Sequence, residues 1–343
     1  MGNTRHGESM KYGVAIWPGG HEELAQLARL AEEQGFDYIG IPESQSLAHE
    51  VYVSLTVVAQ ETTKPLIGPT VTNPLTRHPA VTASAIASIN DVSGGRAFLG
   101  IGTGDSAVLN LGLRPAKHAQ MREYIEAVRT VLTGQPYEYQ GRQIHVKWSQ
   151  SLVPLMISAE GPRTLALGGE IADIVMVHTG LSTEVLKESI SQIRDGEAIA
   201  GKTAGATQVW AFAKCNISDD RDEAIDKIKM ALAASGHHAF RFTLDGKHVP
   251  EELRESIAIL QREYVPVEHE QLGHTRNAVL SDELGLTDYL ADRFAVVGTP
   301  YECREKVRSI EAAGVDMLLI TAIGPNPSEI IRRFGEEVIG PHK

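Results

Sequence analysis

The sequence predicts an α/β fold, a TIM-type (β/α)8 barrel with an insertion before the last strand. Apolar strand-like segments alternate with helical segments through eight units of the 343-residue chain, joined by short turns, as in parallel strands with crossover helices. The period breaks over 235–294, where no strand-then-helix unit can be identified. A doubly wound open sheet is the alternative. It is disfavoured because the strand lengths are even and no Gly-x-Gly-x-x-Gly turn follows the first strand.

Each element is predicted from its apolar period and its end signals. Helices start at capping residues or prolines and stop at glycines such as Gly35, Gly94 and Gly134. The expected strands are 10–16, 36–41, 66–72, 96–101, 155–159, 174–177, 208–216 and 316–320. The main expected helices are 21–34, 51–61, 79–93, 117–132, 162–171, 182–200, 251–263 and 299–313, with a closing helix ending near 338. Residues 135–151 indicate an external hairpin or loop, residues 1–9 a disordered leader, and 10–343 a single barrel domain.

Composition excludes several classes of protein. Hydrophobic content of 42% and charged content of 22% are ordinary for a globular enzyme. The net charge of −12, without a basic cluster, argues against nucleic acid or an anionic membrane as a partner. No apolar run reaches the roughly 20 residues of a membrane span. Cys215 and Cys303 show neither metal spacing nor a disulfide framework, so we expect no metal site and a cytoplasmic location.

Two neighbouring strand ends in the region 66–105 deliver polar and glycine residues to one place. The strand over 66–72 runs into Asn73-Pro74, and the strand over 96–101 runs into Gly102-Thr103-Gly104-Asp105. Ligands of parallel α/β folds bind at the carboxyl edge of the sheet. We therefore expect the functional site at this edge.

The turn Glu160-Gly161-Pro162-Arg163-Thr164 stands between a predicted strand and a predicted helix. Free amides at a helix N-terminus, together with the Thr164 hydroxyl, can hold a phosphate dianion. The same residues also fit an ordinary strand-to-helix turn. On its own, the turn leaves both interpretations open.

These segments resemble the bacterial luciferase-like family of flavin- and deazaflavin-dependent oxidoreductases. The matching pieces are Thr-Asn-Pro-Leu-Thr-Arg-His-Pro-Ala at 72–80, Ser-Gly-Gly-Arg-Ala-Phe-Leu-Gly-Ile-Gly-Thr-Gly-Asp at 93–105, Ser-Ala-Glu-Gly-Pro-Arg-Thr-Leu at 158–165 and Val-Gly-Thr-Pro at 297–300. The resemblance runs over about 11–338. It implies a TIM barrel with an insertion before the last unit, in agreement with the prediction from the residues alone.

The resemblance also implies which residues contact the cofactor. Its phosphate would be held by Glu160, Gly161, Arg163, Thr164, Thr179 and Gly180. Its ring would lie over a cis peptide between Thr70 and Val71, with further contacts from Thr72, Asn73, Gly102 and Thr103. A plain trans peptide is the alternative at 70–71, and Asn73 also fits a turn residue before Pro74.

Three polar side chains are the candidates for chemistry: Asp105, Asn73 and Glu43. Asp105 can accept a hydrogen bond from substrate or act as a base, and the resemblance implies an acid facing the substrate there; a capping role is the alternative. Several family members carry a catalytic histidine near the end of the second strand, where this chain has Glu43-Ser44. His237 and His238 could line the mouth of the site, but the sequence favours solvated loop residues.

The resemblance leads to three hypotheses about function. The first is a monooxygenase that takes reduced FMN and oxygen to a small organic substrate, with a separate flavin reductase as a partner. The second is a deazaflavin-dependent reductase or dehydrogenase that transfers a hydride, because the 72–79 segment is similar to methylene-tetrahydromethanopterin reductases. The third is a non-catalytic flavin-binding barrel. The sequence favours the first.

Two expectations concern association and mobility. The predicted helices around 51–59 and 80–89 are apolar on all sides, which favours a homodimer through these helices. The insertion lies where a loop would overhang the strand ends, so we expect part of 236–280 to act as a lid. Leu253, Ile257 and Leu260 share one face of the helix over 251–263, so this portion should dock.

Overall fold

The computed structural model describes residues 9–241, 243–273 and 275–342, and the predicted leader falls almost entirely outside this range. Eight parallel strands form a barrel in the order β3-β2-β1-β11-β9-β8-β7-β4. Bridges from Ile67 to Ala97 and from Thr72 to Ile101 connect the two end strands, β3 and β4. The barrel strands are β1 (Lys11–Ala15), β2 (Tyr38–Ile41), β3 (Leu66–Pro69), β4 (Leu99–Ile101), β7 (Leu155–Ala159), β8 (Ile174–Val177), β9 (Gln208–Ile217) and β11 (Met317–Thr321). The predicted TIM-type barrel is confirmed.

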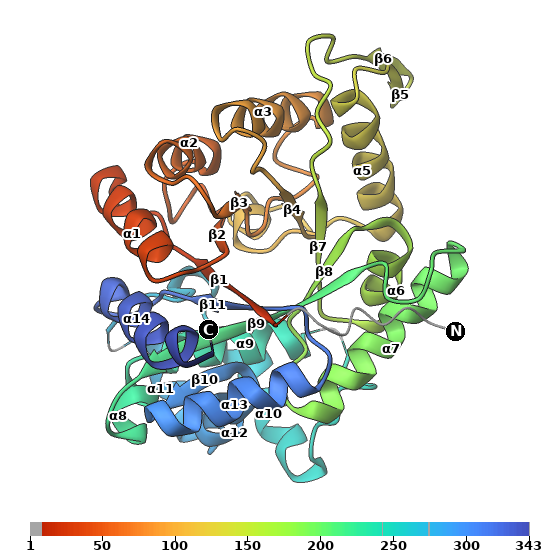
Figure 1. Cartoon of the computed structure of the whole chain (residues 1–343). Coiled ribbons are helices and arrows are strands. Elements are labelled where there is room, and N and C mark those ends of the chain that lie inside the picture. Colours follow the sequence, from red (N-terminus) through yellow and green to blue (C-terminus); the bar gives the residue numbers. More distant parts are fainter. Residues whose placement is uncertain (1–8, 242, 274, 343) are drawn as a thin grey trace.

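Helices surround the strands on the outside of the barrel (Figure 1). They are α1 (His21–Glu33), α2 (Val51–Glu61), α3 (Pro79–Val92), α5 (His118–Leu132), α6 (Pro162–Ile171), α7 (Thr183–Ile199), α13 (Pro300–Ala312) and α14 (Pro327–Phe334). A short helix α4 (Ser106–Leu109) follows β4, and β5 (Tyr137–Tyr139) pairs with β6 (Arg142–Ile144) as the external hairpin that the sequence indicates. No helix in the described ranges is both long and apolar enough to cross a membrane.

The interior of the barrel is filled by large side chains. Tyr38, Phe98 and Trp210 pack against one another, with ring centroids 4.2 to 5.9 Å apart. Met156, Met176, Met317 and Leu319 complete this inner cluster. A separate and larger apolar core lies between the strands and the surrounding helices. The filled interior leaves the carboxyl ends of the strands as the place where a ligand can enter.

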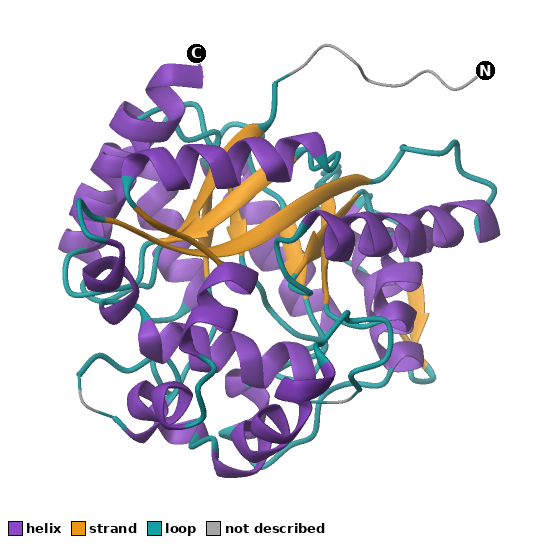
Figure 2. Cartoon of the chain, turned by 90° about the horizontal axis from the view of Figure 1, so that it is seen from below, coloured by secondary structure: helices purple, strands orange, loops and turns teal. Residues whose placement is uncertain are grey.

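The insertion is a helical subdomain with its own apolar core. After α8 (Arg221–Asp226) it comprises α9 (Lys229–Phe240), α10 (Arg254–Glu263), α11 (Arg276–Glu283) and α12 (Thr287–Phe294). Leu232, Phe240, Ile257, Leu260 and Leu290 are buried together in it. Figure 2 shows a group of helices to one side of the strands. The predicted docking of the helix over 251–263 is confirmed, since Ile257 and Leu260 are buried and Leu253 packs against the same core.

Several boundaries differ from the prediction. The third strand ends at Pro69 and the fourth begins only at Leu99, because beyond these points β3 and β4 meet in isolated bridges. Residues 235–240 belong to α9, which starts at Lys229 inside the segment expected to precede the insertion. The insertion ends in a strand that the sequence analysis missed, β10 (Ala295–Gly298).

Strand β9 holds the insertion in place. Its first half pairs with β11, from Trp210 beside Met317 to Lys214 beside Thr321. From Lys214 onward the strand pairs instead with β10. The ten-residue β9 therefore extends past the carboxyl end of β11 and joins the insertion to the barrel at that edge.

Arg96 reinforces the join between β3 and β4 at its amino-terminal side. Its guanidinium donates hydrogen bonds to the carbonyl oxygens of Ala59, Thr62, Pro65 and Ser93, at 2.7 to 3.1 Å. Nη1 also donates to the Thr62 hydroxyl at 3.1 Å. One side chain thus provides hydrogen-bond donors to several carbonyl oxygens at the place where β3 and β4 are connected by isolated bridges.

We expect Arg96→Ala to lower the free energy of unfolding by roughly 2–4 kcal/mol, because several carbonyls lose a charged donor. Urea unfolding of the variant measures this loss. Arg142→Ala, in the exposed β5–β6 hairpin, is the matched control and should stay within about 0.5 kcal/mol of the parent. Equal stability of the two variants would contradict the role assigned to Arg96.

Candidate active site

A cavity of about 920 Å³ opens at the carboxyl ends of the barrel strands. Residues after β2, β3, β4, β7 and β8 form one side, and α9 with the segments after it forms the other. The sequence-predicted residues on its wall are Glu43, Thr70, Val71, Thr72, Asn73, Gly102, Thr103, Asp105, Glu160, Gly161, Arg163 and Thr164. Segments far apart in the sequence therefore meet around one space.

Thr179 and Gly180 are the two predicted residues that do not line this cavity. The Thr179 hydroxyl lies 2.8 Å from the Ser189 hydroxyl, and its carbonyl accepts from Arg293 at 2.8 and 3.1 Å. Gly180 has φ +133°, and a Cβ there would meet the Arg293 side chain at 2.9 Å. Both residues are thus packed against Arg293 and not on the cavity wall, and their assignment to the phosphate site stays a prediction.

The wall after β3 has the backbone that the resemblance implies. The peptide bond between Thr70 and Val71 is cis, which confirms that expectation. The Asn73 side-chain oxygen accepts from the amides of Leu75 and Thr76 at 2.9 and 3.0 Å. Among the described residues, Asn73 Nδ2 and the Thr70 hydroxyl are buried without a hydrogen-bond partner. Asn73 is thus a turn residue that still has a donor for a ligand.

Glu43 is held rather than free to move. One of its carboxylate oxygens pairs with Arg77, which also binds Glu50 at 2.6 Å. The other oxygen of Glu43 is buried and finds no partner within the described ranges. The ion pair orients the Glu43 carboxylate, so this side chain suits a polar contact better than proton transfer.

The corner beside α6 can hold an anion. Gly161 is the N-cap of this ten-residue helix and makes no side-chain cap. Pro162 has no N–H and the Thr164 amide donates to the Gly161 carbonyl at 3.0 Å, so the Arg163 amide is the donor left at the positive end of the helix. The Thr164 hydroxyl lies 3.0 Å from His118 Nε2, and Lys117 and Arg163 line the same corner. The Glu160 carboxylate contacts His238 instead, so it is not a phosphate ligand.

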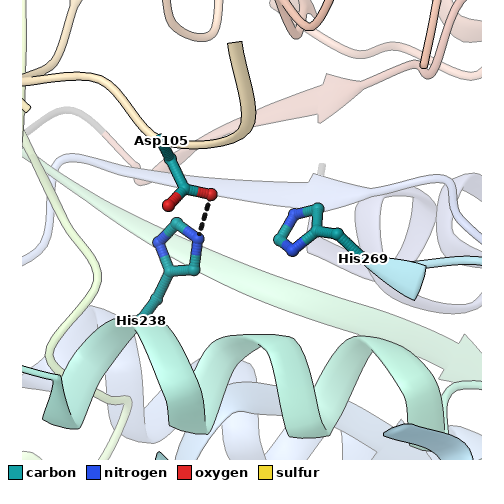
Figure 3. A group of neighbouring side chains, drawn as sticks. All are labelled: Asp105, His238 and His269. Carbon is teal, nitrogen blue, oxygen red and sulfur yellow. Dashed lines mark hydrogen bonds and ion pairs between the residues drawn. The ribbon is translucent and has the colours of Figure 1, made fainter. Parts of the chain in front are cut away.

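The opposite side of the cavity carries a cluster that joins the insertion to the barrel. His238 of α9 reaches Asp105 after β4, with Nε2 2.7 Å from Oδ2, and Glu160 after β7, with Nδ1 3.1 Å from Oε1. Arg241, one turn further along α9, donates to Asp105 Oδ1 at 2.7 Å. Figure 3 shows the ring of His269 turned toward the same Asp105–His238 pair.

The electrostatics of this cluster favour a charged histidine. Burial opposes the charge on His238, but the carboxylates of Asp105 and Glu160 raise its pKa to about 9. Burial likewise opposes ionisation of the carboxyls, yet His238 lowers the pKa of Glu160 to about 2 and, with Arg241, holds the pKa of Asp105 well below its usual range. All three groups are therefore charged at neutral pH.

The sequence analysis missed most of this cluster. It favoured solvated loop positions for His237 and His238, but both lie on α9 and are partly buried. It did not name Arg241, or the buried pair of Lys214 and Glu270. The three-residue spacing of His238 and Arg241 would have pointed to one helix face, had 235–241 been recognised as helical.

The pKa of His238 makes stability depend on pH. Because this pKa is raised from 6.5 to about 9 on folding, its stabilising effect is complete below pH 6.5 and is lost as pH rises through 9. We expect the free energy of unfolding to fall by roughly 2–3 kcal/mol across this window, and His238→Gln to flatten the fall. Urea unfolding at several pH values tests this, with the exposed His248→Asn as control. The same slope in parent and His238→Gln would refute it.

Comparisons with known proteins agree with this architecture. Residues 4–317 match the family model described as luciferase-like monooxygenase. The chain is 33% identical to a 5,10-methylenetetrahydromethanopterin reductase of Archaeoglobus fulgidus, covering 96% of this chain and 99% of that one. It is 26% identical to an F420-dependent glucose-6-phosphate dehydrogenase of Microbacterium testaceum, covering 93% of each. The solved coenzyme F420-dependent tetrahydromethanopterin reductase of Methanopyrus kandleri superposes with a TM-score of 0.77 at 26% identity, covering 98% of this chain and 100% of that one.

These relatives correct one expectation. The favoured hypothesis was a monooxygenase using reduced FMN, but these full-length relatives are reductases and a dehydrogenase, and two of the three carry F420 in their names. The hypothesis of FMN-dependent monooxygenation is therefore wrong, and the oxidoreductase class stands. By the match to its family model and by its full-length relatives, the chain belongs to the luciferase-like monooxygenase family.

Proposed function

We propose that this protein is an F420-dependent oxidoreductase that transfers a hydride between the deazaflavin and a small organic substrate. The observation that carries the proposal is its end-to-end similarity to 5,10-methylenetetrahydromethanopterin reductases and to F420-dependent enzymes. When bound, the deazaflavin would supply the hydride chemistry, and the protein would supply placement and electrostatics.

The cavity fits such a group at both ends. A deazaflavin carries polar ring edges and a phosphate, and both need partners. The buried donor of Asn73 and the Thr70 hydroxyl, unpartnered within the described structure, offer contacts beside the cis peptide. Gly161, Arg163 and Thr164 form the anion corner. We propose that these residues, with Val71, Thr72, Gly102 and Thr103, hold the cofactor.

The charged side chains at the α9 end of the cavity restrict which substrates can bind there. Lys214 is paired with Glu270, and Arg241 with Asp105. Lys247 donates to the carbonyl of Ala239. A phosphate on the reacting end of a substrate would have to displace these partners, at a cost in desolvation and lost pairing. We therefore favour a substrate whose reacting end is uncharged, such as a methylene-bridged tetrahydropterin.

The test compares cofactors directly by equilibrium titration. We expect F420 to bind and to change its absorbance on adding a methylene-tetrahydropterin under reducing conditions, whereas FMN should bind more weakly. Absence of turnover with bound F420 would favour the alternative of a non-catalytic barrel. Tighter binding of FMN than of F420 would contradict the proposal.

The double substitution Gly161→Ala with Thr164→Ala addresses the anion corner. It should weaken F420 binding by roughly 2–4 kcal/mol, because a hydroxyl contact is lost and the methyl group added at position 161 takes up open space that the anion would use. The exposed Thr203→Ala is the matched control. A folded double variant with unchanged affinity would exclude this corner as the phosphate site.

We propose that the protein is a homodimer joined through α2 and α3. Val53 and Val81 are half exposed on these helices, at 51% and 55% of their surface. Val53→Lys with Val81→Lys should shift the species to a monomer in sedimentation at micromolar concentration. Val267→Lys in the insertion, at a side chain 67% exposed, should leave the dimer intact. A parent protein that sediments as a monomer would refute the proposal.

The proposal needs no separate flavin reductase, since that partner belonged to the reduced-FMN hypothesis. Cys215 and Cys303 are free and buried, and we propose a cytoplasmic location on that ground. The lid expected over 236–280 stays a prediction, with Gly236 now placed within α9.

A further inference from the structure

Four histidines line the cavity in the described structure: His118, His178, His238 and His269. Burial, followed by the nearby Arg163, lowers the pKa of His118. Burial lowers the pKa of His178 to about 4, and it also lowers that of His269. These three rings are therefore neutral at pH 7. His238 differs from them because it is surrounded by carboxylates.

The geometry around His238 requires two protons on one ring. A neutral imidazole has one N–H and one acceptor nitrogen. Both nitrogens of His238 lie within hydrogen-bond distance of carboxylate oxygens, which accept only: Asp105 at 2.7 Å and Glu160 at 3.1 Å. Both nitrogens must then donate, so the ring is an imidazolium. Its side chain keeps 20% exposure on the cavity side of α9.

The groups around this ring come from every element packed against it. Asp105 and Glu160 follow β4 and β7, and Arg241, the C-cap of α9, binds Asp105. The ring of His269 is 5.5 Å away and that of His237 is 6.5 Å away, measured between centroids. His178, which also contributes to the electrostatics of Glu160, and the Lys214–Glu270 pair lie further round the same wall.

A metal ion is a poorer occupant of this cluster than a proton. One ligand atom from each of Asp105, His238 and His269 lies within 4.8 Å of the other two, close enough to share an ion. Arg241, however, already binds Asp105, and its fixed charge would repel a cation. His238 would also have to give up a proton from the nitrogen that binds Asp105. We therefore assign the cluster to proton chemistry.

We propose that His238 is the catalytic residue that supplies the proton accompanying hydride transfer, and that Asp105 and Glu160 position it. The inference rests on the proposed function. In the reducing direction the substrate carbon gains a hydride, the two-electron reductant being the bound reduced cofactor. The bond from that carbon to its neighbouring nitrogen or oxygen loses its electron pair to the heteroatom. The Nδ1–H of His238 exchanges its longer bond to Glu160 for this atom and gives it the proton, which leaves the ring neutral and still bonded to Asp105. Oxidation reverses each step.

With His238 as the proton donor, the insertion contributes a group that the barrel strands do not. Asp105 and Glu160 stay ionised, so neither can donate a proton at neutral pH. Glu43 is tied to Arg77 at the end of β2. The donor arrives instead from α9, outside the barrel strands. The two carboxylates keep it protonated across the physiological range, as a general acid requires.

The first test needs no cofactor. Nitrogen-15 spectra of histidine-labelled protein should show one ring with both nitrogens protonated up to about pH 9, absent in His238→Gln. Glu160→Gln should move the titration of that ring to lower pH, and His248→Asn should leave it unchanged. A His238 ring that titrates near 6.5, or that carries one proton at pH 7, would overturn the proposal. Added zinc that displaces the proton at micromolar concentration would also overturn it.

The second test measures hydride transfer in a single turnover with bound reduced F420. His238→Ala should bind F420 as the parent does and lose about 100-fold or more in rate, with recovery on adding imidazole. In the parent the rate should fall as pH rises through 9, and in Glu160→Gln this fall should begin at lower pH. An unchanged rate, or a loss that imidazole cannot restore, would overturn the role of His238. Failure of the parent to bind F420 would instead refute the proposed function and leave the nitrogen spectra intact.

Discussion

The pairing of β9 with two different strands is the constraint on which the site depends. Up to Lys214 the strand belongs to the barrel through β11, and beyond Lys214 it belongs to the insertion through β10. Ladder hydrogen bonds on both sides fix its direction, so the chain leaves the barrel at the carboxyl edge at a set position. Helix α9 follows α8 from there and presents His238 and Arg241 to the strand ends. The shared strand and the contacts of His238 and Arg241 with Asp105 together fix the insertion above the cavity.

The cavity is divided by charge into two parts with different tasks. At the α6 corner, helix amides, Thr164 and Arg163 form a region that favours an anion. At the α9 side the charges pair with one another, as Arg241 does with Asp105 and Lys214 with Glu270. Paired charges keep their field short in range, which suits a site that must place one proton without attracting free anions. On the proposed function, the α6 corner would anchor the cofactor and the α9 side would carry the reaction.

The repeating strand-and-helix units could be predicted from the sequence, whereas the insertion and its contacts with the barrel could not. Strands over 155–159 and 174–177 match the structure because each is a short apolar run between clear turn signals. The candidate site residues after β3 and β4, including Thr70, Asn73 and Asp105, were predicted because they follow strands of the repeating unit. Residues 229–240 were mistaken in part for a loop, since α9 is apolar nearly all round and has no amphipathic period. The contact of His238 with Asp105 joins residues 133 positions apart in the sequence, and a local sequence pattern cannot predict a contact of that separation.

The sequence motifs could not identify the cofactor, for a related physical reason. FMN and a deazaflavin both carry a phosphate and a flat ring, so the residues proposed for these two groups, at 160–164 and around 70–73, would serve either cofactor. What separates the two chemistries is the fate of protons. Oxygen activation asks for a dry pocket that keeps water from a reactive intermediate. Hydride transfer to a carbon beside nitrogen or oxygen asks for a proton donor within reach. The proposed imidazolium of His238, between Asp105 and Glu160, would meet the second need, so the contacts of α9 support the same proposed chemistry as the similarity to F420-dependent enzymes.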